Sequence, residues 1–194
     1  SLVSIRRAAI IGASGYTGAE LMRLIFGHPN LDLALATGDS QAGGRAADLY
    51  PSLAAGYPDL VYADSDPTSI VDRVSGLDVV FLGLPHEASL ELVPRLVDRV
   101  GCVVDLSAAF RLKDPTQYPR YYGFDHGRPE LLSRAVYGLP ELHRDELREA
   151  TLVATPGCYV TAATLALAPL IREGLIENSG VRSEEHTSEL QSRV

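Results

Sequence analysis

Short apolar runs alternate with longer segments of mixed polarity along this chain. The runs are bounded by Gly, Pro, Asp and Asn, which is typical of buried strands, and the segments between them carry helix start and stop signals. The pattern predicts strands at residues 8–11, 31–37, 78–82, 102–106 and 151–155. It predicts helices at residues 20–26, 67–74, 87–100, 142–150 and 162–171.

This order of elements predicts an α/β fold. Strands that alternate with helices form an open, doubly wound, mostly parallel sheet of the Rossmann type. Ligands of such sheets bind at the carboxyl ends of the strands. The segment 114–140 interrupts the alternation, because it is rich in Tyr, Gly, Pro and Arg, and we expect a long loop there.

Composition and charge narrow the class of protein. The chain has 194 residues, of which 46% are hydrophobic and 22% charged, as in an ordinary globular domain. A net charge of −8 argues against binding to nucleic acids or anionic membranes. The two cysteines suggest no disulfide framework, and no apolar run is long enough to cross a bilayer. We therefore expect a cytoplasmic protein whose partners include neither nucleic acid nor membrane.

A glycine-rich turn follows the first predicted strand. Its spacing, G-x-x-G-x-x-G, joins that strand to a helix. Such a turn lets the backbone approach a pyrophosphate and directs helix N–H groups toward it, although a tight turn without a ligand has the same sequence. The residues expected to bind a dinucleotide cofactor here are Gly12, Ser14, Gly15, Tyr16, Thr17 and Gly18.

The end of the second predicted strand bears on which nucleotide binds. An acidic residue near that point favours the free 2′-hydroxyl of NAD, and Asp39 lies there. Thr37, Ser40 and Gln41 could instead hold the 2′-phosphate of NADP, with Arg45 nearby. The residues alone leave the preference open.

Cys158 lies directly after Pro156-Gly157 and directly before an apolar segment that predicts a helix. A helix N-terminus lowers the pKa of a thiol and can hold an oxyanion, so the position suits a catalytic nucleophile. A lone cysteine is also often a packing residue. Cys102, within an apolar strand, is expected to be of that inert kind.

Five motifs occur in a characteristic order. They are Gly12-Ala-Ser-Gly-Tyr-Thr-Gly18, Gly83-Leu-Pro-His86, Asp105-Leu-Ser-Ala-Ala-Phe-Arg-Leu112, Tyr137-Gly-Leu-Pro-Glu141 and Pro156-Gly-Cys-Tyr-Val-Thr-Ala162. Together they resemble the N-acetyl-gamma-glutamyl-phosphate reductase family of arginine biosynthesis, from about residue 8 to about residue 180. Aspartate-semialdehyde dehydrogenase belongs to the wider group, but its cysteine usually follows asparagine.

The resemblance implies a reaction and a cofactor. The substrate would be a small acyl phosphate, N-acetyl-glutamyl 5-phosphate, and the products N-acetyl-glutamate 5-semialdehyde and phosphate. Cys158 would form a thioester, which hydride from NADPH would reduce. The family is homo-oligomeric, and no metal is expected, since the histidines of this chain lack metal-ligand spacing.

The resemblance also assigns roles to three further residues. Arg111 would hold a substrate carboxylate or phosphate, although the family's Asp-Phe-Arg-Leu motif has Ala109 in its first position here. A surface arginine that pairs with Asp114 is the alternative. Glu141 would position the substrate or a water, unless it is only a favourable helix N-terminal carboxylate. His86 would lie near the nicotinamide, unless it is a solvated loop histidine.

We expect three regions in the chain. Residues 1–157 would form the NAD(P)-binding domain, and residues 158–181 the nucleophile helix with the beginning of an α+β substrate domain. Residues 182–194 read as the translation of a sequencing-adapter oligonucleotide, so we expect a non-native tail. Only His186 follows Cys158, and it does not match the family's acid/base histidine. The chain as given is therefore expected to lack turnover.

Two other functions fit parts of this sequence. One is a catalytically silent nucleotide-binding module, which has no need of a cysteine at a helix N-terminus. The other is a related reductase that acts on a carrier-bound aminoadipyl phosphate in lysine biosynthesis.

Overall fold

A parallel sheet organises the chain, and the computed structural model describes residues 4–182. Six strands in this range are ordered β2-β1-β3-β4-β6-β5, and every adjacent pair is parallel. The strands are β1 (Arg6–Ile11), β2 (Leu31–Ala36), β3 (Val79–Leu82), β4 (Cys102–Asp105), β5 (Val136–Tyr137) and β6 (Leu152–Ala154). The predicted mostly parallel, Rossmann-type sheet is confirmed.

Helices and short 3₁₀ turns connect the strands. The helices are α1 (Tyr16–Phe26), α2 (Ala46–Leu49), α3 (Pro67–Val74), α4 (His86–Leu96), α5 (Tyr118–Tyr122), α6 (Pro129–Arg134), α7 (Pro140–Arg148) and α8 (Cys158–Arg172). The 3₁₀ turns are η1 (Pro51–Leu53) and η2 (Pro115–Gln117). Asp66 caps α3 as its sequence suggests, because its carboxylate accepts a hydrogen bond from the Ser69 N–H at 2.9 Å.

The order of the strands reverses between β1 and β3. The chain passes from β1 to β2 in one direction, then returns across β1 to β3 and continues to β4. In doubly wound sheets the ligand crevice lies at this switch point, outside the carboxyl ends of the strands. The topology therefore places the crevice beside the glycine turn, which follows β1.

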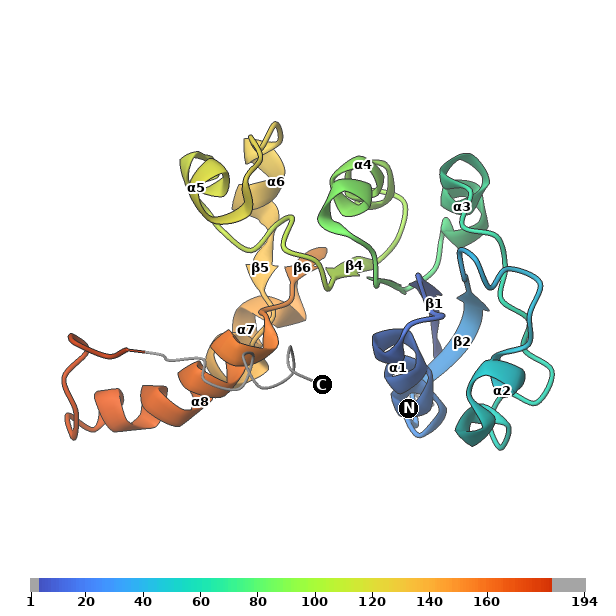
Figure 1. The fold of residues 1–194 in the computed structure, drawn as a ribbon, viewed down its shortest axis with the longest axis horizontal. Coiled ribbons are helices and arrows are strands. Elements are labelled where there is room, and N and C mark those ends of the chain that lie inside the picture. Colours follow the sequence, from blue (N-terminus) through green and yellow to red (C-terminus); the bar gives the residue numbers. More distant parts are fainter. Residues whose placement is uncertain (1–3, 183–194) are drawn as a thin grey trace, which may run out of the picture. The chain divides into compact units, whose positions relative to one another are not determined.

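The core has two layers, one on each face of the sheet. Ala9 and Ile11 of β1 pack in a cluster with α3, α4 and α6, whereas Ala8 and Ile10 pack with α1 and the segment 46–62. Figure 1 shows α3, α4 and α6 on one side of the strands and α1 on the other. Because strand side chains alternate between faces, one apolar run supplies both layers.

The expected loop at residues 114–140 is wrong, because η2, α5, α6 and β5 lie within it. These elements are too short to show a period in the sequence. The prolines that indicate a loop instead lie in the first turns of η2, α5 and α6, where proline is tolerated. The sequence pattern did not predict α2 and η1 either. Bounds differ as well: α1 begins earlier than expected, at Tyr16, and α8 begins at Cys158 itself.

An aromatic cluster stabilises this segment. Tyr118 and Phe110 are almost fully buried, and the ring centroid of His126 lies 4.6 Å from that of Tyr118. The two ring nitrogens of His126 lie 2.9 Å from the Ala109 carbonyl oxygen and 3.2 Å from the Arg128 N–H nitrogen. Both contacts are satisfied by neutral histidine, with Nε2 as donor and Nδ1 as acceptor. Burial accordingly lowers the pKa of His126 below its ordinary value of 6.5.

The depressed pKa of His126 predicts a loss of stability in mild acid. The unfolded chain binds a proton near pH 6.5, whereas the folded chain resists protonation until lower pH. The free energy of unfolding should therefore fall as the pH drops below 6.5, by at most about 1.4 kcal/mol per pH unit. Urea unfolding of the wild type and His126→Gln across this range should show a shallower slope for the variant. Equal slopes would contradict the prediction, and the exposed His28, as His28→Gln, is the control.

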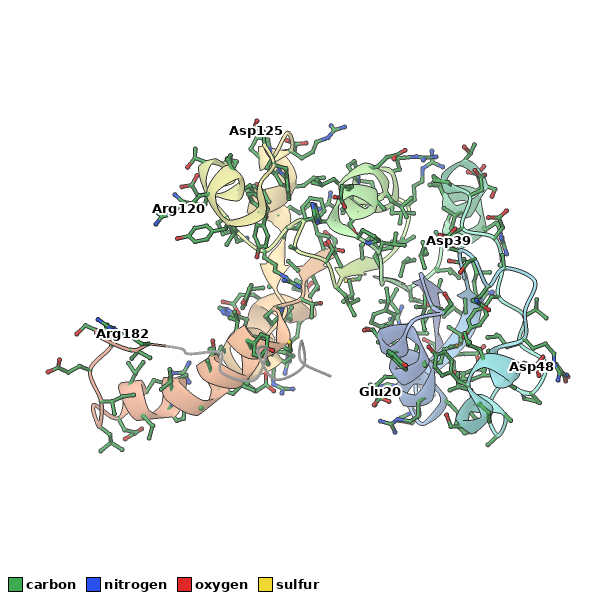
Figure 2. All side chains as sticks on the ribbon, in the orientation of Figure 1. Glu20, Asp39, Asp48, Arg120, Asp125 and Arg182 are labelled. Atoms are coloured by element: carbon green, nitrogen blue, oxygen red, sulfur yellow. The ribbon has the colours of Figure 1, made fainter. Side chains whose placement is uncertain are left out.

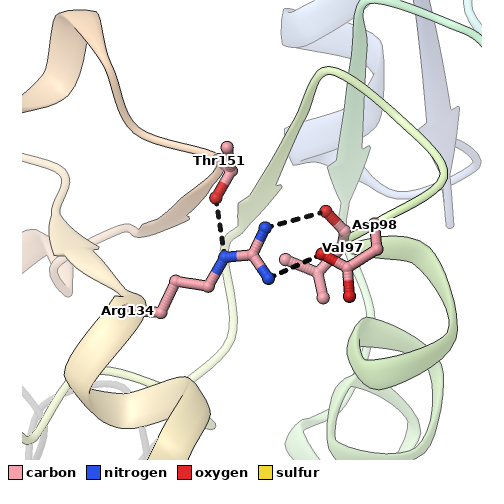
Figure 3. Close-up of polar contacts among 4 residues, drawn as sticks. All are labelled: Val97, Asp98, Arg134 and Thr151. Carbon is pink, nitrogen blue, oxygen red and sulfur yellow. Dashed lines mark hydrogen bonds and ion pairs between the residues drawn. The ribbon is translucent and has the colours of Figure 1, made fainter.

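Arg134 joins three segments of the chain at the amino-terminal side of β6 (Figure 3). Its Nε donates to Thr151 Oγ1 at 2.8 Å, its Nη1 to Asp98 Oδ1 at 2.7 Å and its Nη2 to the Val97 carbonyl at 3.3 Å. The planar fork of a guanidinium matches this arrangement, in which each nitrogen has its own acceptor.

We expect Arg134→Ala to lower the free energy of unfolding by about 1–2 kcal/mol. Arg134→Lys should restore only part of this, since an ammonium on a single stem cannot reach all three acceptors. Asp98→Asn should cost less than about 1 kcal/mol, because Asp98 is largely exposed to solvent. Urea unfolding measures all three; a loss in Asp98→Asn equal to that in Arg134→Ala would show that the charge pair dominates.

The chain divides into two compact units, residues 1–157 and residues 158–194. The first contains the sheet. In the described part of the second, α8 is a helix of 15 residues, none of which is buried. The nucleotide-binding and substrate roles expected for these regions stay predictions. The expected non-native tail lies outside the described residues except for Arg182, as does His186.

Candidate functional site

The glycine turn brings the end of β1 against the end of β3. Gly12 has a φ of +83°, which favours glycine, and a β-carbon there would overlap the Gly83 carbonyl. Gly18 lies in the first turn of α1, and a β-carbon on it would overlap the backbone of Ala13. Glycine at these two positions therefore allows close packing of β1, β3 and α1.

Gly15 differs from the other two glycines of the turn. It is the N-cap of α1, and a β-carbon on it would have no protein atom within 4 Å. No side chain caps this helix, and its first turn has no acidic residue. The first N–H groups of a helix lack intrahelical acceptors, so this end of α1 can hold an anion. The turn thus fits the pyrophosphate of a dinucleotide.

Two clefts open at the switch point. The larger, of about 530 Å³, lies against the glycine turn and extends to α3 and α4. Its lining includes Gly12, Ser14, Gly15, Asp39, Ser65, Gly83, Pro85 and Glu91. The smaller, of about 260 Å³, is lined by Gly12, Gly15, Tyr16, Thr17, Gly18, Gly83, Leu84 and Leu106. All six predicted residues of the turn therefore face one cleft or both.

Thr37 supports the turn from inside the protein. It is fully buried, and its Oγ1 accepts hydrogen bonds from the Gly12 N–H at 3.1 Å and from Ser65 Oγ at 2.9 Å. The hydroxyl oxygen of Thr37 thus accepts hydrogen bonds within the protein, and Thr37 does not line either cleft; its expected role in cofactor binding stays a prediction. Tyr50 provides a second support, since its hydroxyl donates to the Ser14 carbonyl at 2.9 Å. No local sequence signal indicates this role of Tyr50, because it lies 36 residues from Ser14 along the chain.

Two other predicted cofactor residues do not line these clefts. Ser40 is exposed and does not line the larger cleft, although the adjacent residue Asp39 does. His86 begins α4 and stacks on Phe124, with ring centroids 4.9 Å apart and planes 11° apart. Its Nε2 lies 3.2 Å from Glu87 Oε1. The neighbouring Pro85 lines the cleft instead.

Asp105 forms a buried network that sequence reasoning did not identify as part of a site. It ends β4 and is fully buried, and its Oδ1 accepts from Ser89 Oγ at 2.8 Å and from the Ser107 N–H at 3.1 Å. Its Oδ2 accepts from Ser107 Oγ at 2.7 Å. Burial raises the pKa of Asp105, and these hydrogen bonds oppose the rise. The network fixes the loop after β4, where Leu106 lines the smaller cleft. The signal that could have identified this network is the acidic residue Asp105 at the end of an apolar strand.

Arg111 binds the loops that follow β4 and β6. Its Nε donates to the Thr155 carbonyl at 2.8 Å, and its Nη2 donates to the Leu106 carbonyl at 3.0 Å. Its Nη1 lies 3.5 Å from the position that a β-carbon of Gly157 would occupy. The alternative of a surface arginine paired with Asp114 is wrong, because Asp114 instead accepts from Thr116 and Gln117. Arg111 thus holds the chain just before Cys158.

We expect Arg111→Met, which keeps the apolar stem, to lower the free energy of unfolding by about 2 kcal/mol. The physical reason is the loss of two hydrogen bonds from a charged group to half-buried carbonyls. Urea unfolding measures the loss, and Arg120→Met on the exposed surface is the matched control. A loss of unfolding free energy no larger than that of the control would contradict the role of Arg111 in holding the loops after β4 and β6.

Cys158 is exposed at the first position of α8, whereas Cys102 is partly buried in β4. Burial raises the pKa of the Cys102 thiol to about 11, in agreement with an inert residue. Glu141 is exposed in the first turn of α7, where a carboxylate also favours the helix N-terminus. The roles of Cys158 and Glu141 as site residues stay predictions.

Neither a metal centre nor a membrane span is found in residues 4–182. No three His, Cys, Asp or Glu side chains in this range are grouped so that they could hold a metal ion. Within the same range, each helix is too short or too polar to cross a bilayer.

The folds of solved structures and the sequences of curated proteins resemble this chain. Aspartate-semialdehyde dehydrogenase from Candida albicans, solved with NADP, matches 88% of the chain and 48% of its own with a TM-score of 0.61 and 17% identity. At that identity the match shows the fold. N-acetyl-gamma-glutamyl-phosphate reductase from Methanopyrus kandleri is 49% identical over 87% of the chain and 48% of its own length.

A second relative has a different substrate in its name. The LysW-L-2-aminoadipate/LysW-L-glutamate phosphate reductase of Sulfurisphaera tokodaii is 46% identical over 88% of the chain and 48% of its own length. The chain therefore spans about half the length of the curated relatives it matches.

The family model of the semialdehyde dehydrogenase NAD-binding domain matches residues 7–150, which include the glycine turn and both clefts. The resemblance noted from the five motifs is thereby confirmed at the level of the family. This protein belongs to the semialdehyde dehydrogenase family and carries its NAD-binding domain.

Proposed function

We propose that the natural protein is a nicotinamide-dependent reductase of N-acetyl-glutamyl 5-phosphate that acts through a thioester on Cys158. The observation that carries the proposal is the common edge of the sheet. The glycine turn after β1, the Leu106 loop after β4 and the Thr155–Gly157 segment after β6 all leave parallel strands at their carboxyl ends. The cofactor cleft and the segment that leads to Cys158 thus share the edge of the sheet at which the parallel strands end.

The first chemical step belongs to Cys158. Its thiolate attacks the acyl carbon, a C–S bond forms, and the C–O bond to phosphate breaks with its electron pair leaving on phosphate. When bound, the reduced cofactor supplies hydride to the thioester carbon. The C–S bond then breaks and returns the thiolate, so one difficult reduction is divided into two easier steps.

Other residues hold the parts of this site in position. Gly12, Gly15 and Gly18 shape the phosphate cradle at α1. Arg111 fixes the chain before Cys158 through the Thr155 carbonyl, and its Nη1 can still contact a substrate carboxylate or phosphate. Glu141 is proposed to position the substrate. A cytoplasmic location and self-association of the whole protein are parts of the proposal that follow from the resemblance.

The relative from Sulfurisphaera tokodaii supports a second candidate, a reductase of carrier-bound aminoadipyl phosphate. Both candidates use the same acyl phosphate chemistry. They differ in whether the acyl group is attached to a small acetylated amino acid or to a carrier protein.

The test of the proposed activity begins with sequencing of the source DNA beyond codon 182. The whole reading frame would be expressed and assayed in reverse, as phosphate-dependent reduction of NAD⁺ or NADP⁺ by N-acetyl-glutamate 5-semialdehyde. We expect turnover that Cys158→Ser abolishes and Cys102→Ser retains.

Each outcome has a separate meaning. Turnover with carrier-bound aminoadipate semialdehyde alone would favour the second candidate. A whole protein that binds nucleotide but turns over neither aldehyde would refute the reductase and indicate a silent module.

A further inference from the structure

We infer that Asp39 makes the larger cleft selective for NAD(H), the dinucleotide without a 2′-phosphate. The inference rests on the proposed function of the cleft as a nicotinamide dinucleotide site. It departs from the NADPH that the sequence resemblance implied.

The position of Asp39 fits contact with the adenosine ribose. It lies about 20 residues beyond the last glycine of the turn, where an acidic side chain of a doubly wound sheet accepts hydrogen bonds from the ribose hydroxyls. Asp39 lines the same cleft as Gly12 and Gly15. Figure 2 shows it beside α3, at the ends of the strands.

The charge of the cleft opposes a second phosphate. Among the described residues that line it, Asp39 and Glu91 are acidic and none is basic. A 2′-phosphate beside the exposed Asp39 would bring two like charges together, and no basic residue of the cleft lining would offset their repulsion. A ribose hydroxyl there would instead donate a hydrogen bond to the carboxylate.

The basic residue closest in sequence is already paired. Arg45 donates from Nε to Asp48 Oδ2 at 3.1 Å and from Nη2 to Asp48 Oδ1 at 2.8 Å. Figure 2 shows Asp48 on α2, away from Asp39. The hydroxyl of Thr37 is buried and used by the turn. The sequence suggested four residues that could hold a 2′-phosphate, and Thr37 and Arg45 are engaged within the protein. The other two, Ser40 and Gln41, are neutral.

Direct binding to the 194-residue chain tests the inference without any need for turnover. Titrations with NADH and NADPH, followed by nicotinamide fluorescence and by calorimetry, give the two dissociation constants. We expect NADH to bind at least about tenfold more tightly than NADPH. Asp39→Asn should weaken NADH and strengthen NADPH, and Asp39→Arg should reverse the preference, since a guanidinium binds phosphate bidentately.

Two matched variants separate direct contact of Asp39 with the nucleotide from the overall negative charge of the cleft. Glu91→Gln removes one negative charge from the same cleft, and it should leave the preference for NADH in place. Arg45→Ala should change neither constant, because Arg45 is proposed to have no part in binding. Circular dichroism of each variant confirms that it is folded.

The results distinguish the inference from the proposed function. NADPH binding as tight as NADH binding, or a selective loss of NADPH in Arg45→Ala, would overturn the inference while the nucleotide site stands. Binding of neither nucleotide to the folded chain would overturn the proposed site itself. A preference for NADH that disappears in Asp39→Asn and persists in Glu91→Gln supports both.

Discussion

Gly18→Ala is expected to lower the free energy of unfolding by about 3 kcal/mol or more. The added β-carbon would overlap backbone atoms of Ala13, which cannot move aside as a flexible side chain can. Ala13 lies within the glycine turn and is itself fully buried, and its N–H donates to the Thr37 carbonyl at 2.6 Å. Relief of the overlap would therefore require α1 to shift away from the end of β1. Chemical unfolding of the variant and the wild type measures the loss.

Gly15→Ala is the matched control for this substitution. The same atom is added three residues earlier, at a position with a negative φ of −82° and no neighbouring protein atom within 4 Å. We expect stability to change by less than about 0.5 kcal/mol and nucleotide binding to weaken clearly, because the new methyl group would lie where the pyrophosphate approaches. Equal stability of Gly18→Ala and Gly15→Ala would contradict the close packing of α1 on β1.

Cys158 is expected to react with iodoacetamide at least about 100-fold faster than Cys102 at neutral pH. The thiolate is the reactive species, and burial raises the pKa of Cys102 from 9.0 to about 11, so its thiolate fraction falls by two powers of ten. Limited access to β4 slows Cys102 further. Cys158 is exposed at the beginning of α8. Mass spectrometry of alkylated peptides over time gives both rates.

Two controls make the comparison of the cysteines decisive. Cys158→Ser should leave only the slow reaction. In urea the wild type should alkylate at both positions with similar rates, because unfolding removes the burial that protects Cys102. Similar rates in the native protein would refute the assignment of Cys158 as the reactive thiol and Cys102 as a packing residue.

Local signals in the sequence determined much of the fold and the centre of the candidate site. Apolar runs bounded by turn residues located β1 to β4 and β6, because a buried strand needs consecutive apolar residues and leaves a pattern within a few positions. The glycine turn was equally readable from its spacing, and two of its three glycines, Gly12 and Gly18, meet steric demands of nearby backbone. The cofactor-binding role predicted for the turn and the nucleophile role predicted for Cys158 came from the family resemblance and from their positions at helix N-termini.

The tertiary structure decided what each polar residue beside the turn contacts. Thr37 reads as a ligand-binding hydroxyl in the sequence, but in the fold it is buried against the Gly12 N–H. A surface Arg111 paired with Asp114 was one reading of the sequence, but in the fold Arg111 donates to the Thr155 and Leu106 carbonyls. Asp39 gains its place in the cleft only when β1 and β3 are neighbours. The physical reason is that these contacts join strand ends far apart in sequence, so their partners exist only after the parallel sheet has formed.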